Sequence, residues 1–205
     1  MQERSMRLGK VVKSNSHCDY IVQLADAMEM DEPPQPDDYG FGSFVKLETE
    51  DRHWAIGIIY NSQLSNPAFL SNGPRLSSEP DLTFTPDLIT ETRTLLWTVL
   101  IGTLEKQEDR CYGSHGIPRA VVPINTGVST LTREEIHAFH LTKNDRPQFC
   151  YYSHLLRCGG TFASDLLQQV LRELTSSGLF AEPDQRALEI LRKELSWKQT
   201  MGAIR

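Results

Sequence analysis

The stretch RLGKVVKSNSHCDYIVQL, from Arg7 to Leu24, decides the fold class. Residues 7–14 and 19–24 are short runs rich in valine and isoleucine, and the polar sequence NSHC lies between them. Short runs of β-branched residues joined by a few polar residues are typical of a β-hairpin. The sequence therefore predicts two antiparallel strands near its start.

More strands follow this hairpin. GSFVKLE (42–48) and HWAIGIIYNS (53–62) predict a second hairpin around TEDR, and Gly57 inside its second strand indicates a bend or bulge. TRTLLWTVLIGTLE (92–105) predicts a long strand. IPRAVVPIN (117–125) predicts a further strand, and its two prolines place it at an edge or at a strand end. Short strands with glycines at their bends predict a small β-barrel.

We expect a mainly β protein with α-helices, divided into a β-barrel over residues 1–131 and a helical extension over 132–205. The barrel should carry two long loops, at 26–40 and 63–86. The first loop holds three prolines and six acidic residues. Carboxylates repel one another and prolines prevent regular pairing, so we predict that this loop is mobile unless a partner holds it.

Helical signals begin at Thr132. TREE (132–135) is a capping box and predicts a short helix to about His140. A longer helix should end near Gly178, because helical spacing relates Leu166, Leu167, Val170, Leu171 and Leu174. EPDQRALEILRKELSWKQT predicts a last helix with Pro183 near its first position.

Composition limits the function. The chain has 205 residues, a net charge of −6 and 39% apolar residues, which fits a globular protein and argues against a surface that grips duplex DNA. The N-terminal sequence MQERSMRLGK is not a secretory signal, and the longest apolar run, 95–104, is too short to span a bilayer. We expect a cytoplasmic protein with four free cysteines and no membrane contact.

The order of the strand phrases resembles the HAS-barrel, the small β-barrel found at the N-terminus of HerA-type DNA-translocating ATPases and of rotary ATP synthase head subunits. The matching phrases are Leu8-Gly9, Gly42 to Leu47, Ile56-Gly57-Ile58-Ile59 and Asn66-Pro67. LLWTVLIGTLEK resembles a later strand of that family. IPRAVVPINTGVSTLTREEI resembles its segment of a proline-rich stretch, a glycine, a strand and a short helix. The resemblance covers about the first 140 residues.

The resemblance implies an assembly and docking module, because the barrel in that family forms a ring collar and receives partner proteins. In HerA-type ATPases the motor domain follows the barrel. Its phosphate-binding loop comes after a histidine and a short buried strand, and a similar order is found here in His154, Leu155-Leu156 and the glycines at 159–160. The second glycine and the lysine of that motif are missing, so we expect neither ATP binding nor any other cofactor. The alternative for this stretch is the packed start of a helix.

Five residues form the densest group of metal-ligating types, namely His137, His140, Cys150, His154 and Cys158. Zinc accepts these side chains, but paired Cys-x₂-Cys or His-x₃₋₅-His knuckles are absent. A cysteine nucleophile beside a histidine is a further alternative, although no signature of a known cysteine hydrolase surrounds either cysteine. We therefore expect packed or surface residues and no metal.

We predict a non-enzymatic protein-interaction or assembly module that binds a protein partner or a second copy of itself, without direct nucleic-acid contact. The alternatives are an accessory factor that docks onto a DNA-processing translocase or nuclease, and a small metal-dependent or Cys-His hydrolase. The expected partner-binding residues lie on the last helix: Leu188, Leu191, Leu195 and Trp197. Trp54 and Trp97 lie in predicted strands and should be core residues.

Overall fold

The computed structural model describes residues 5–27, 29–65, 93–107, 110–158 and 160–203, and within the last range it describes no side chain beyond Trp197. Among these residues, seven strands form one antiparallel sheet. Their bounds are β1 Arg7–Ser14, β2 Asp19–Leu24, β3 Phe44–Glu48, β4 His53–Ser65, β5 Arg93–Gln107, β6 Arg110–His115 and β7 Gly127–Thr130.

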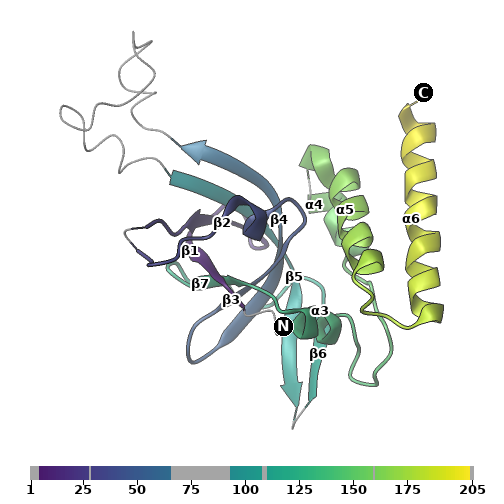
Figure 1. Cartoon of the computed structure of the whole chain (residues 1–205), viewed down its shortest axis with the longest axis horizontal. Coiled ribbons are helices and arrows are strands. Elements are labelled where there is room, and N and C mark those ends of the chain that lie inside the picture. The colour runs from purple at the N-terminus through teal and green to yellow at the C-terminus, as the bar shows by residue number, and fades with distance from the viewer. Residues whose placement is uncertain (1–4, 28, 66–92, 108–109, 159, 204–205) are drawn as a thin grey trace.

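The sheet closes into a six-stranded barrel. The strand order is β2-β1-β7-β3-β4-β5, and β2 pairs with β5 to complete the ring, while β6 extends β5 as a hairpin outside it (Figure 1). Side chains from all six strands fill the interior, among them Leu8, Tyr20, Val45, Leu100 and Val128. The expected class of a β-barrel followed by helices is therefore confirmed.

Strands β4 and β5 bury both of their faces over residues 55–59 and 98–102. Ala55 and Leu96 point into the barrel, whereas Ile56 and Val99 belong to a second core on the outside of the same strands. This explains why both strands have nearly continuous apolar sequences, since a strand buried on both sides does not need alternating apolar and polar residues. Gly57 lies where the register between β4 and β5 shifts, as its position in the strand predicted.

The helices cover the outer face of this shared wall. Their bounds are α3 Arg133–Phe139, α4 Tyr152–Cys158, α5 Ala163–Ser176 and α6 Glu182–Ala203. Figure 1 shows α5 between the barrel and α6, with α6 outermost. The buried side chains of α5 share one cluster with Phe44, Ile56, Ile58, Val99 and Ile101 of the barrel wall.

Two helix boundaries follow from the sequence as predicted. Thr132 caps α3, because its hydroxyl accepts from Glu135 N at 3.2 Å while the Glu135 carboxylate accepts from Thr132 N at 2.8 Å. Helix α5 ends at Ser176, and Gly178 follows with φ 62°, a conformation that favours glycine.

The segment IPRAVVPIN is not a strand, so that prediction was wrong. Pro118 and Pro123 lack the N–H groups that a sheet ladder needs, and the segment instead forms an irregular loop. Val122 is buried in the barrel interior, and its N–H donates to the Tyr20 hydroxyl at 3.1 Å. Strand β6, RCYGSH, was not predicted, because it is an edge strand of polar composition and lacks the β-branched residues that indicate a strand.

The two predicted loops differ in what the structure describes. The acidic loop 26–40 contains a short 3-10 helix, η1 Pro36–Tyr39, and Glu29 forms an ion pair with Lys10 at 2.7 Å. Its mobility stays a prediction. The second loop begins later than expected because β4 continues to Ser65, and the remainder of 63–86 lies outside the described residues. No described helix has the length and apolar character needed to cross a membrane.

Candidate functional site

The predicted partner-binding residues of α6 separate into two environments. Leu188, Leu191 and Leu195 are half-buried and pack against the core that α5 shares with the barrel wall. Trp197 is 68% exposed. The three leucines therefore attach α6 to the protein, and Trp197 remains available at the surface.

Trp197 belongs to a second stripe of α6, which faces solvent. Ile190 is 54% exposed and lies seven residues before Trp197, which is two helical turns and so the same face. Ala187 and Glu194 are also exposed and complete a spacing of three, four and three residues. This spacing is visible in the sequence, but the leucine spacing on the neighbouring face is more regular and therefore predicted the partner-binding face instead.

The other predicted tryptophans are only partly buried. Trp54 packs against the barrel core, and the Arg52 guanidinium lies 4.2 Å from the centre of its ring. Trp97 is half-exposed on β5. The prediction that both are core residues is therefore correct only in part.

An aromatic pocket opens between the barrel and the start of α5. Its cavity of about 330 Å³ is lined by Tyr39, Phe41, Tyr60 and Phe162 among others. Phe41 is 41% and Phe162 50% exposed, and their rings meet edge to face at 6.4 Å between centroids. Exposed aromatic side chains around a small hollow are typical of surfaces that receive an apolar group.

The five predicted His and Cys ligands do not assemble into one site. Cys150 is exposed, and its backbone N–H donates to His115 Nδ1 at 3.1 Å. His137 packs against Phe180, with 5.7 Å between ring centroids. Only His154 and Cys158 lie together, on successive turns of α4, since Cys150 precedes that helix.

His140 is a buried packing residue. Its Nδ1–H donates to Ile136 O at 2.7 Å, and its Nε2 accepts from the Tyr151 hydroxyl at 2.7 Å. Burial lowers the pKa of His140 to about 3 and raises the pKa of Tyr151 above its usual range. His115 lies 5.7 Å away between ring centroids, and burial lowers its pKa to about 4. Both imidazoles are therefore neutral at pH 7.

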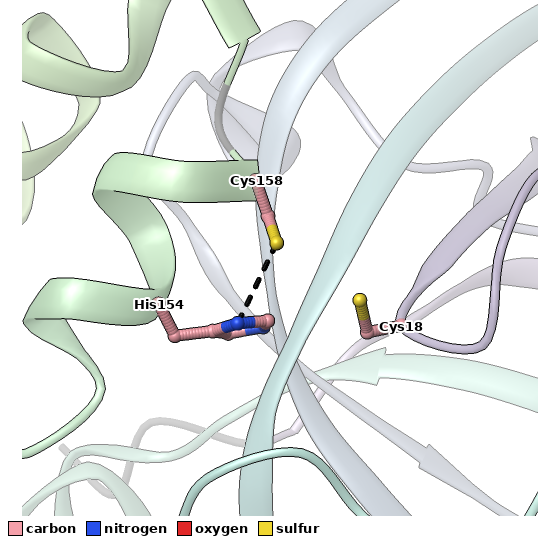
Figure 2. A group of neighbouring side chains, drawn as sticks. All are labelled: Cys18, His154 and Cys158. Atoms are coloured by element: carbon pink, nitrogen blue, oxygen red, sulfur yellow. Dashed lines mark hydrogen bonds between the residues drawn. The ribbon is translucent and has the colours of Figure 1, made fainter.

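A third ligand that sequence reasoning missed joins the pair on α4. Cys18 lies in the loop between β1 and β2, and its sulfur, His154 and Cys158 present ligand atoms that all lie within 4.8 Å of one another. Figure 2 shows the Cys158 thiol directed at the His154 ring, with Cys18 approaching from the hairpin loop. About 140 residues separate Cys18 from α4 in sequence, so only the closure of the barrel brings them together.

One residue of β5 fixes both sides of this cluster. Leu100 donates its N–H to Cys18 O at 2.8 Å, and its carbonyl accepts from His154 Nε2 at 3.0 Å. The Nε2 atom of His154 is therefore protonated, and Nδ1 presents its lone pair to the Cys158 thiol at 3.5 Å. Burial lowers the pKa of His154 and raises the pKa of Cys158, so this pair is a neutral imidazole and a thiol.

This neutral pair differs from an activated cysteine nucleophile. A nucleophilic cysteine needs a depressed pKa, which a neighbouring positive charge or helix N-terminus provides. Cys158 instead lies at the last residue of α4, and its pKa is raised. The arrangement can hold a soft metal ion more readily than it can attack a carbonyl.

The glycine turn before α5 does not have phosphate-loop architecture. Leu155 and Leu156 belong to α4, whereas the resemblance to a phosphate-binding loop required a buried strand there. Gly160 has φ 61° and begins a 3-10 turn of three residues, η2 Gly160–Phe162, that leads into α5. His154 and the leucine pair thus belong to a helix, and Gly160 begins the turn that leads into the next helix.

The whole chain matches one known family. Residues 1–205 match the family described as "Domain of unknown function (DUF8166)". No curated protein matches the chain.

Proposed function

We propose that the chain, which belongs to the DUF8166 family over its whole length, is a non-enzymatic protein-interaction module. The observation that carries this proposal is the exposed stripe on α6, which contains two large apolar side chains. Trp197 and Ile190 are 68% and 54% exposed on the outermost helix of the molecule (Figure 1). Tryptophan is among the residue types that contribute most to binding energy in protein interfaces.

The environment of the stripe suits a partner helix. Leu188, Leu191 and Leu195 hold α6 against the protein, so the neighbouring stripe is presented on a supported helix. Ala187, Ile190, Glu194 and Trp197 follow the spacing with which one helix packs along another. The partner in this proposal presents an apolar helix face, and a second copy of the chain is one protein that offers such a face.

We further infer that the barrel is of the HAS type. Three features support this assignment. The barrel has six antiparallel strands, and Gly57 lies at a register shift in β4. A proline-containing loop precedes β7, and β7 is followed by the short helix α3. The HAS-barrel serves assembly and docking, which agrees with an interaction module. A DNA-processing translocase or nuclease recovered as the partner would extend the proposal to an accessory role.

The proposal is tested on the full chain with the double variant Ile190→Asp, Trp197→Ala. We expect it to lose the complex formed by the wild type, seen as a lower mass by light scattering or as loss of the partner in affinity capture. The expected weakening of binding is at least about 30-fold, because loss of a hot-spot residue costs about 2 kcal/mol or more.

The matched control is Leu64→Ala. Leu64 is 75% exposed, yet it lies at the end of β4, on the far side of the molecule from α6 (Figure 1). This variant should keep the wild-type complex, and both variants should keep the wild-type melting temperature. A double variant that folds and still binds with unchanged affinity would remove α6 from the functional argument.

A further inference from the structure

The geometry points to a zinc site formed by Cys18, His154 and Cys158, which fastens the helical extension to the barrel. Two thiols and one imidazole are ligands that zinc prefers, and their ligand atoms lie within 4.8 Å of one another. This site is separate from the α6 stripe, and nothing in the proposed interaction function requires it.

The distances fit a tetrahedral ion. Zinc binds sulfur at about 2.3 Å and nitrogen at about 2.0–2.1 Å, so two such ligands on a tetrahedron lie about 3.6 Å apart. Cys158 Sγ and His154 Nδ1 are 3.5 Å apart. The Cys158–His154 edge of the tetrahedron is therefore already in place. Cys18 Sγ lies within 4.8 Å of both atoms, so a movement of about 1 Å would bring it to coordination distance.

The histidine is oriented as a metal ligand. Metal-binding histidines almost always donate their other ring N–H to a carbonyl or carboxylate, which fixes the tautomer and the ring. His154 Nε2–H donates to Leu100 O at 3.0 Å, which leaves the lone pair of Nδ1 free to face the Cys158 sulfur at 3.5 Å. His154 is also only 4% exposed, so the ring cannot turn freely.

The fourth ligand is a water molecule or another small ligand. The nearest carboxylate in sequence, Asp19, is already engaged, because Oδ1 accepts from the Tyr60 hydroxyl at 2.9 Å and Oδ2 accepts from Asn15 Nδ2 at 3.1 Å. Three protein ligands and one exchangeable position are the arrangement of catalytic zinc sites, whereas most structural sites have four protein ligands. Binding forms one bond to each thiolate sulfur and one to Nδ1, and the two thiol protons pass to solvent.

The placement of the ligands on two segments gives the ion a stabilising effect, whatever occupies the fourth position. Cys18 belongs to the β1–β2 hairpin of the barrel, whereas His154 and Cys158 belong to α4. A bound ion would link these two segments through its coordinate bonds to the three side chains. It would therefore oppose separation of α4 from the barrel wall.

The test measures zinc in the purified full chain after exposure to zinc and removal of free metal. We expect one equivalent per chain in the wild type. In Cys18→Ser and in Cys158→Ser we expect loss of that equivalent and a zinc affinity at least about 100-fold weaker. Loss of a residue that only hydrogen-bonds to a metal ligand already weakens metal affinity by up to about 100-fold. Cobalt(II) in place of zinc should give a thiolate-to-metal charge-transfer band that both variants lose.

Cys111→Ser and Cys150→Ser are the matched controls, because both cysteines are exposed and lie outside the cluster. They should keep the bound zinc. Zinc at 100 times its Kd should also raise the melting temperature by about 5–10 °C in the wild type and in these controls.

Three results would overturn the proposal. They are absence of bound zinc in the wild type, retention of zinc by Cys18→Ser, and a Cys18–Cys158 disulfide in protein purified without an oxidant. Cys18→Ser changes a half-buried loop residue and should fold, so its circular dichroism spectrum shows that a loss of zinc reflects the lost ligand.

Discussion

Replacing Leu167 with aspartate is expected to abolish the cooperative folding of the protein. Leu167 lies on α5, is 1% exposed, and packs in the cluster that includes Ile56 and Val99 of the barrel wall. Loss of a buried leucine side chain costs about 2–5 kcal/mol. A buried carboxylate without a partner adds several kcal/mol more. The sum is comparable to a whole free energy of unfolding of about 5–15 kcal/mol.

Urea unfolding followed by circular dichroism measures this effect, and size-exclusion chromatography detects the aggregation expected from the exposed cluster. Ser164→Asp is the matched control, because it places the same carboxylate on an exposed position in the first turn of the same helix. That variant should have unchanged or slightly raised stability. A Leu167→Asp protein with a normal unfolding transition would show that α5 does not stabilise the barrel.

The protein is expected to lose stability as the pH falls below about 6.5. The pKa of His140 is lowered to about 3 in the folded protein, while an unfolded histidine titrates near 6.5. Between these values the unfolded state binds a proton that the folded state does not, so the free energy of unfolding decreases as pH falls. At pH 5 this loss is about 2 kcal/mol from His140. His115, with a pKa of about 4, adds up to a similar amount.

Urea unfolding at pH 7.5 and pH 5.0 tests this prediction. His140→Gln should be less stable at pH 7.5 and should lose about 2 kcal/mol of the difference between the two pH values. Leu171→Ala, which removes a buried side chain but no titrating group, should keep the wild-type difference. An unchanged pH difference in His140→Gln would show that this histidine is not the acid-sensitive group.

Local patterns predicted most of the architecture but not the assembly of the cluster. The hairpins, the capping box at Thr132 and the glycine after α5 follow from neighbours in sequence, so they could be recognised directly. The IPRAVVPIN segment was wrongly predicted as a strand because its apolar residues resemble those of a strand. In the structure an apolar residue of this loop, Val122, is buried in the barrel interior. Strand β6 is polar because it lies at the edge of the sheet, outside the barrel.

The candidate sites show the same distinction. Helical spacing placed Leu188, Leu191 and Leu195 on one face, and they do share one, but spacing alone does not say whether that face meets the protein or a partner. His154 and Cys158 are one helical turn apart and could be paired from sequence. Their third neighbour, Cys18, depends on the pairing of β2 with β5, which joins distant parts of the chain.

The shared wall of β4 and β5 has a consequence for how the molecule opens. Because these two strands belong to both cores, neither the barrel nor the helical layer can come apart without exposing apolar surface of the other. The backbone amides of Ile58 and Leu100 should therefore be among the slowest to exchange with solvent deuterium, and they should exchange only through global unfolding. Heating should likewise melt strands and helices in a single calorimetric transition, so that the protein behaves as one cooperative unit.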